Sequence, residues 1–100
     1  MANIVRVFRA VVHSGKEEEF KSFFLNDAVP LLRKHKGLVS IQVGFPREET
    51  PQEFLMTTVW NSIETLSEFS GVNWYEAVID PREERLLARV EANHYYEVPL

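Results

Sequence analysis

The sequence of 100 residues has no cysteine, only four glycines and no long apolar run. Without cysteine, a disulfide scaffold, a thiolate zinc site and a cysteine nucleophile are excluded. The glycines are too widely separated for a phosphate-binding loop, so no nucleotide cofactor is indicated. No apolar stretch reaches the length of about 18 residues that a membrane span needs, and the N-terminus does not read as a signal peptide. We therefore expect a cytoplasmic protein without a membrane partner.

Charge of one sign is not concentrated anywhere along the chain. Fifteen acidic and eleven basic residues give a net charge of −4, and the basic residues are scattered. Nucleic-acid binding rewards a concentrated basic face, so nucleic acid is not an expected partner. The three histidines, His13, His35 and His94, share no metal-ligand spacing, and no metal site is expected.

The size of the chain predicts one domain over residues 1–100, because two hydrophobic cores would not fit in 11.7 kDa. A domain of this length buries roughly two thirds of the surface that its unfolded chain exposes. That core is thin, and no disulfide supplements it. Self-association is a natural source of further stability.

Hydrophobic periodicity predicts the order strand, helix, strand, strand, helix, strand. The first strand is apolar on both faces, apart from Arg6 and Arg9. We expect strands over 3–12, 38–45, 54–60 and 90–98, helices from Ser14 to Gly37, from Asn61 to Gly71 and from Asp80 to Arg89, and an exposed loop over 46–51.

Capping residues mark these helix ends. Ser14 with Glu17 has the capping-box spacing, and Asn61 is the expected cap of the next helix. Gly37 is interpreted as a left-handed C-terminal cap. Pro30 removes a backbone donor inside the first helix, so a kink or break is expected there.

This order matches an α+β, ferredoxin-like βαββαβ fold, in which a four-stranded antiparallel sheet carries its helices on one face. A first strand with two apolar faces needs cover on both sides, and the helices cover only one. A second copy of the chain would cover the other through a two-fold interface. We therefore expect a homodimer whose two sheets form an eight-stranded barrel.

Several segments, in this order and spacing, are similar to those of a known family. They are His13 to Phe20, Val29 to Leu32, Gly37, Val59 to Ser62 with Leu66 and Phe69, and His94 to Val98. In these segments, which span nearly the whole chain, the sequence resembles the antibiotic biosynthesis monooxygenase superfamily of dimeric α+β barrels.

The resemblance implies a homodimer with a pocket between the sheet and the helices of each subunit. Some relatives oxidise quinols or polyketide aromatics with dioxygen and no cofactor. Others degrade haem, using an asparagine on the first strand, a tryptophan late in the second helix and a histidine beyond it. The matching positions here are Phe8, Phe69 and Ile79. Haem degradation by that mechanism is therefore not expected.

His94 is the candidate catalytic residue. It lies on the face of the last strand that also carries Ala92, Tyr96 and Val98, which is expected to be the buried face. A histidine there could act as a general base on a phenol, or as a donor to a carbonyl or superoxide-like intermediate. The alternative is a core histidine bonded to a neighbouring backbone group.

Aromatic side chains are the candidate substrate-binding residues, because they can stack on a planar ligand. They are Trp60 at the end of the third strand, Trp74 and Tyr75 in the segment after the second helix, Phe8 and Tyr96. For the tryptophans and Tyr75, the alternative is a role in the core.

The remaining charged residues are expected to be structural. A buried arginine needs an acidic or carbonyl partner, and for Arg6 and Arg9 the last strand offers Glu91 and Glu97 for a structural or dimer-interface ion pair. The alternative for these arginines is binding an anionic substrate group. The glutamates at 17–19, 48–49 and 83–84 are interpreted as solvated.

Two functions remain open from the sequence. The first is a cofactor-independent monooxygenase that oxidises a small planar aromatic or quinol with dioxygen. The second is a dimer that binds a small apolar ligand, or has a structural role, without turnover.

Overall fold

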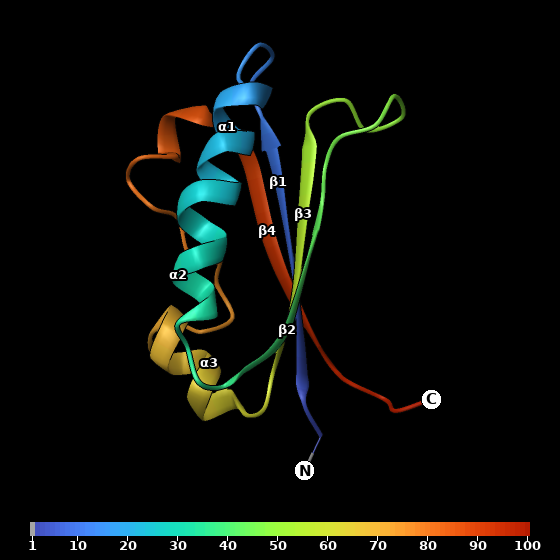
Figure 1. The fold of residues 1–100 in the computed structure, drawn as a ribbon, viewed down its shortest axis with the longest axis vertical. Coiled ribbons are helices and arrows are strands. Elements are labelled where there is room, and N and C mark those ends of the chain that lie inside the picture. The colour runs from blue at the N-terminus through green and yellow to red at the C-terminus, as the bar shows by residue number, and fades with distance from the viewer. Residues whose placement is uncertain (1) are drawn as a thin grey trace.

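A four-stranded antiparallel sheet with helices on one face makes up the computed structural model, which describes residues 2–100 (Figure 1). Its neighbours run in the order β2-β3-β1-β4, and every pair is antiparallel. This is the expected ferredoxin-like βαββαβ topology, which is confirmed. The strands are β1 (Ile4–Val12), β2 (Leu38–Gly44), β3 (Glu53–Trp60) and β4 (Leu87–Tyr96).

The first helical segment is continuous but changes its winding before Pro30. It consists of α1 (Glu17–Phe23), a π-helical turn η1 (Phe24–Ala28) and α2 (Val29–Arg33). The N–H of Val29 donates to the carbonyl of Phe24, five residues earlier. A π turn is one of the ways in which a helix accommodates a proline. The expected disturbance is therefore a wider turn and not a break.

Two expected N-terminal caps are wrong. The α1 helix follows Lys16 without any side-chain cap, so Ser14 does not form a capping box. Helix α3 (Ile63–Ser70) is capped by Ser62, whose Oγ accepts from the backbone N–H of Thr65 at 3.1 Å. Asn61 instead accepts a hydrogen bond from the Thr65 hydroxyl at 2.8 Å.

The expected helix from Asp80 to Arg89 is also wrong. Only a short 3₁₀ turn, η2 (Glu84–Leu86), forms there, and β4 begins three residues earlier than predicted. Leu87 lies opposite Val12 of β1. Pairing with β1 gives the backbone of this stretch its hydrogen bonds, and this tertiary pairing overrides the local helix signals.

The core lies between the helices and one face of the sheet. Alternate residues of β1, from Ile4 to Val12, point toward the helices and are buried. Phe20 packs edge-on against Phe54 of β3, with ring centroids 4.8 Å apart, and Phe24 lies 5.1 Å from Phe20. These phenylalanines fix the helix onto the sheet by burying large apolar surfaces.

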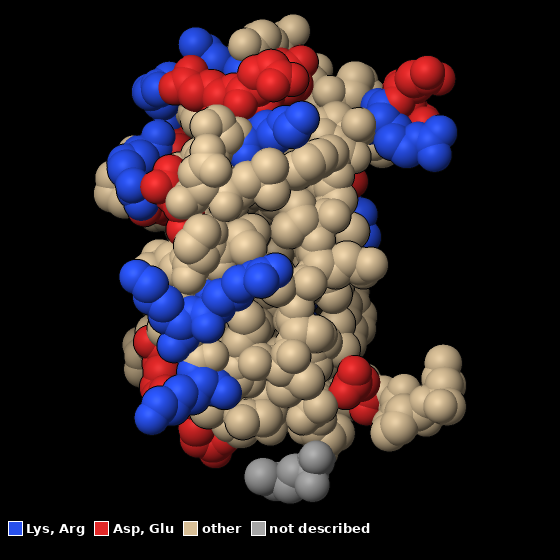
Figure 2. All heavy atoms as spheres, in the orientation of Figure 1, with Lys and Arg blue, Asp and Glu red and all other residues tan. Residues whose placement is uncertain are grey.

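Among residues 2–100, no helix lies on the opposite face of the sheet (Figure 1). Val5, Val7 and Val11 of β1 lie on it and are half-buried. Arg9 is on the same face, where it pairs with Glu53 at 3.4 Å and, as expected, with Glu91 at 3.7 Å. In Figure 2, which has the same orientation, the charged side chains lie mostly on the helix side of the molecule and on the loop between β2 and β3.

Within residues 2–100, no helix combines the length and apolarity that crossing a membrane requires. The cytoplasmic location stays a prediction.

Gly37 is not the left-handed cap that the sequence suggested, since its φ is not positive. Its role is a close approach between the start of β2 and helix α3. A Cβ atom added at Gly37 would lie 2.1 Å from Cβ of Thr65, which is a clash. Gly44, at the end of β2, would meet Leu55 at 3.4 Å, an ordinary contact.

We predict that Gly37→Ala destabilises the fold by about 1–3 kcal/mol, the usual cost of overpacking. Gly44→Ala is the matched control and should change stability by less than about 0.5 kcal/mol. Urea unfolding at one fixed protein concentration measures both. Equal stabilities of the two variants would contradict the close approach.

Candidate functional site

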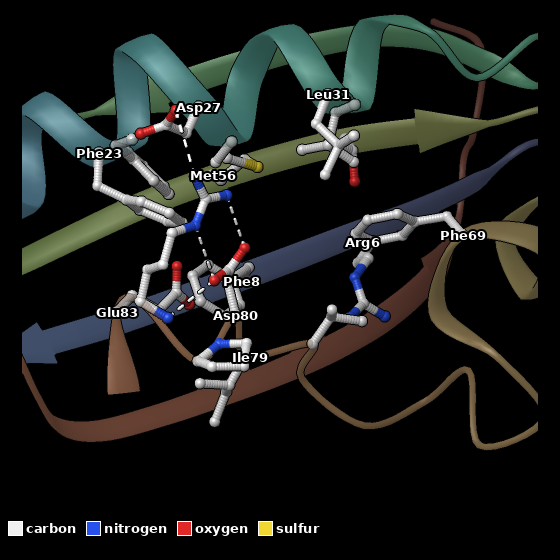
Figure 3. A pocket seen from close by; sticks show the side chains of 17 residues that line it. Arg6, Phe8, Phe23, Asp27, Leu31, Met56, Phe69, Ile79, Asp80 and Glu83 are labelled. Carbon is white, nitrogen blue, oxygen red and sulfur yellow. Dashed lines mark hydrogen bonds and ion pairs between the residues drawn. The ribbon is translucent and has the colours of Figure 1, made fainter. Parts of the chain in front are cut away.

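A cavity of about 300 Å³ lies between the first helical segment and the sheet (Figure 3). Its walls are largely aromatic and aliphatic, and include Phe8, Phe23, Phe24, Leu32, Met56 and Phe69. The polar side chains that reach it are Arg6, Thr58 and Glu83, with Asp27, Asp80 and Arg82 near one end. An apolar hollow with a few polar groups is the usual form of a small-molecule site.

One wall of the cavity is the segment between α3 and η2. Residues 71–83 form turns but neither helix nor strand, and residues 78–83 line the cavity. Two arginines hold this segment in place, Arg6 toward its beginning and Arg82 toward its end. The shape of the cavity therefore depends on these two side chains.

Arg6 crosses from β1 to the first part of that segment. Its Nη1 donates to the carbonyl of Trp74 at 2.7 Å, and its Nη2 donates to the carbonyl of Glu76 at 2.9 Å. Nη1 also lies 2.7 Å from Nε2 of His94. Arg6 is 3 % exposed, and burial lowers the pKa of its guanidinium to about 10. Of the two expected kinds of partner, acidic and carbonyl, Arg6 has the second, together with a histidine, and it pairs with neither Glu91 nor Glu97.

His94 is half-buried on β4, directly opposite Arg6 in the sheet. Burial lowers the pKa of His94, and the charge of Arg6 lowers it further. A neutral imidazole whose Nε2 accepts from Arg6 satisfies both groups. The lone pair that a general base needs is thus directed at Arg6.

The structure places His94 in a second, smaller hollow and not in the wall of the 300 Å³ cavity. This hollow measures about 220 Å³ and also contains Trp74 and Tyr96. The ring centroids of Trp74 and His94 are 5.0 Å apart. Tyr96 and Val98 are exposed, so that end of β4 is not the buried face expected from the sequence.

The other aromatic candidates fall in three different places. Phe8 lines the 300 Å³ cavity. Trp60 is buried outside it, where its Nε1 donates to Oγ1 of Thr58 at 2.9 Å and its ring stacks on Phe69. Tyr75 is exposed and lines neither hollow. The sequence candidates are therefore divided between two hollows, the core and the surface.

Glu83 is a cavity residue that the sequence interpretation placed in solvent, and that interpretation is wrong. The N–H of Glu83 donates to the carbonyl of Asp80 at 2.9 Å, and the resulting turn directs its side chain inward, where it is 5 % exposed. Burial, with a smaller contribution from the charge of Asp80, raises the pKa of Glu83 to about 7. One signal was available: Glu83 precedes the apolar Leu86 and Leu87 by three and four residues, the spacing of one helical face.

Arg82, next to Glu83, points the other way and joins the segment to the helix. Its Nη2 and Nε contact the carboxylate of Asp80 at 2.8 and 3.1 Å, and its Nη1 lies 3.6 Å from Asp27 of η1. Hydrogen bonds from Arg82 lower the pKa of Asp80 to about 2. Figure 3 shows these contacts at the same end of the cavity as Phe23.

The three positions compared with the haem-degrading relatives all line the cavity. They are Phe8, Phe69 and Ile79, and each carries only a hydrocarbon side chain. In residues 2–100, no group of three histidine or carboxylate side chains is placed to hold a metal ion. None of the three offers the polar or ligating atom that the haem mechanism uses.

Comparison with known families gives a match over most of the chain. Residues 3–78 match the model of the family described as antibiotic biosynthesis monooxygenase. A comparison with curated proteins found no match.

Solved structures share the fold at low sequence identity. A protein from Shewanella oneidensis is 14% identical with a TM-score of 0.79, the match covering 96% of this chain and 91% of that one. A conserved protein from Methanosarcina mazei is 21% identical with a TM-score of 0.75, over 95% and 92% of the two chains. A variant of SnoaB, a cofactor-independent oxygenase from Streptomyces nogalater, is 16% identical with a TM-score of 0.75, over 100% and 97%.

The buried carboxyl of Glu83 should make stability depend on pH. A glutamate of the unfolded chain keeps the ordinary pKa of 4.5, whereas in the folded chain the pKa of Glu83 is about 7. The folded state therefore binds this proton more tightly than the unfolded state does. The stability that this provides is fully present below the pKa of the unfolded chain, and it is lost as the pH rises through the pKa of the folded chain. Relative to Glu83→Gln, the wild type should lose about 2–3 kcal/mol by about pH 8.

Urea unfolding at acid and alkaline pH, at one protein concentration, measures this difference. Glu84→Gln is the matched control, because Glu84 is exposed and should keep the pH dependence of the wild type. If the free energies of unfolding of the wild type and Glu83→Gln change with pH in the same way, the carboxyl is not buried in the folded chain.

Proposed function

The chain belongs to the antibiotic biosynthesis monooxygenase family, and we propose that its 300 Å³ cavity binds a small planar phenol or quinol whose anion is oxidised by dioxygen. The observation that carries this proposal is the make-up of the cavity, in which aromatic and aliphatic walls enclose a few polar groups. Such walls favour a flat apolar ring and hold its anion away from water. A structural neighbour described as a cofactor-independent oxygenase supports the same chemistry.

The proposed reaction needs no reductant besides the substrate. The phenol loses its proton to a base, and the phenolate gives one electron to dioxygen. The aryloxyl radical and superoxide combine, which forms a bond between oxygen and a ring carbon. When the O–O bond breaks, one oxygen atom stays as a new carbonyl group. The other leaves as water, with the phenolic proton and the proton of that ring carbon.

His94 remains a candidate base for this reaction, under a geometric condition. Its Nε2 faces Arg6 at 2.7 Å, so it can accept a substrate proton only if Arg6 moves or if the ligand occupies the second hollow. In that hollow, Trp74 and Tyr96 are the aromatic side chains next to it. In the larger cavity, Phe8 and Phe69 would contact the substrate ring.

We also propose a homodimer, formed through the face of the sheet that carries no helix. The half-buried valines of β1 form an apolar strip on this face. The C-terminal segment after Tyr96 and the loop between β2 and β3 both extend on this side of the sheet (Figure 1). Val98 and Leu100 in the C-terminal segment are exposed. A second copy would cover the strip and give these apolar side chains a partner surface.

The oxidation should appear as oxygen uptake when the protein is mixed with a panel of quinols and naphthols. We expect uptake above that of the buffer alone, because these compounds also react slowly with dioxygen unaided. Ala28→Phe places a ring in the cavity and should reduce the excess rate at least about tenfold. Ala88→Phe is the matched control on the surface. Ligand binding without excess uptake for any compound would favour the function without turnover.

The same assay tests His94. A variant His94→Ala that oxidises the panel at the rate of the wild type would remove His94 as the base, while leaving the cavity as the reaction site.

The dimer should sediment at twice the chain mass of 11.7 kDa at micromolar concentration. Val7→Lys puts a charge in the middle of the strip and should shift the protein toward monomer. Val72→Lys is the control, since Val72 is 90 % exposed in the segment after α3. A wild-type protein that sediments as a single chain would contradict the dimer.

A further inference from the structure

The side chain of Glu83 lines the cavity and is 5 % exposed. A hydrogen bond from the backbone of Asp80 lowers its pKa, and in residues 2–100 no side chain donates a hydrogen bond to it or forms an ion pair with it. The nearest cation in sequence, Arg82, is turned toward Asp80 and Asp27. A carboxylate has about four lone-pair sites, so one that lines a cavity and has only a backbone donor can accept a further hydrogen bond from a ligand.

We propose that Glu83 is the group that accepts the proton of an aromatic hydroxyl bound in the cavity. This inference rests on the proposed function, because it assumes that the cavity holds a phenolic ligand. The ligand would place its ring against Phe8 and Phe23 and its hydroxyl against the carboxylate of Glu83. Glu83 is thereby a catalytic residue that the sequence did not suggest.

One end of the cavity offers a hydrogen-bond donor and the other an acceptor, and this difference sets the orientation of a bound ligand. Figure 3 shows Arg6 and Phe69 at one end, and Glu83 and Phe23 at the other. Arg6 is a donor that cannot accept a proton, and three of its contacts are already made within the chain. A hydroxyl group therefore finds its acceptor at the Glu83 end.

The electrostatic surroundings suit an acceptor that works near neutral pH. Burial and the charge of Asp80 raise the pKa of Glu83, while a hydrogen bond from the backbone of Asp80 and the charge of Arg82 lower it by smaller amounts. The other charged groups that line the cavity are Asp27 on η1 and Arg6 on β1. A base is most effective when its pKa lies near the working pH. His94 is less suited, because its accepting nitrogen already faces Arg6.

The proton can be followed through the whole reaction. The O–H bond of the ligand breaks, its electron pair stays on the phenolate oxygen, and the proton goes to a carboxylate oxygen of Glu83. After dioxygen has added to the ring, the protonated Glu83 returns this proton to the peroxide. The O–O bond then breaks with loss of water, and Glu83 is again a carboxylate.

A binding experiment without oxygen tests the acceptor separately from turnover. The probes are 2-naphthol, which has a hydroxyl donor, and 2-methoxynaphthalene, which does not. The preference is the ratio of the affinity for 2-naphthol to the affinity for 2-methoxynaphthalene. In the wild type, this ratio should grow roughly tenfold as Glu83 ionises between about pH 5.5 and about pH 8.5. In Glu83→Gln the preference should not change with pH, and in Glu84→Gln it should follow the wild type.

The outcomes separate the two proposals. A preference that does not vary with pH in the wild type would overturn the role of Glu83, and this result does not depend on the folding of any variant. If Glu83 is the base, the wild-type rate of oxygen uptake should fall below about pH 7, where Glu83 becomes protonated. If Glu83→Gln takes up oxygen at the wild-type rate and its rate falls in the same pH range, the oxidation stands and Glu83 is not its base. A pH-dependent preference without uptake supports Glu83 as the acceptor and overturns the oxidation.

Discussion

The buried guanidinium of Arg6 is the interaction on which the site depends most. A charged group in a protein interior is expensive unless its donors are paired. Here two backbone carbonyls and the His94 imidazole pair with them, and both carbonyls belong to the segment after α3. One side chain of the first strand thus joins the last strand to an otherwise irregular segment, and that segment forms a wall of the cavity.

Arg82 completes this arrangement from the other end, and the two arginines differ in character. Arg6 is buried and makes short hydrogen bonds, whereas Arg82 is exposed and bridges Asp80 and Asp27. Exposed ion pairs contribute little to stability, and salt screens them. The segment is therefore held firmly near Trp74 and loosely near Asp80. Glu83 lies just beyond the loosely held part, where a ligand's approach would disturb the fewest strong contacts.

The fold followed from the sequence because period-2 and helical patterns report burial directly. The two apolar faces of β1 predicted both the helix layer and the open face, while the 80–89 helix failed because strand pairing with Val12 outweighed local signals. The site was harder to predict. His94 and Glu83 are both side chains that can act as a base. Only the tertiary contacts show that Arg6 faces the accepting nitrogen of His94 and that, in the described residues, no side chain pairs with the carboxyl of Glu83.

The π turn of η1 has a consequence for how relatives of this chain are compared. It contains one residue more than an α-helical path of the same length would, and one residue corresponds to a rotation of about 100° around the helix. Asp27 and Ala28 belong to this turn, and Leu31 and Leu32 follow it, yet all four reach the same cavity. In a relative whose helix lacks the turn, equivalent residues after it are offset by one in the alignment. An ungapped alignment with such a relative would pair cavity residues that follow the turn with solvent-facing ones.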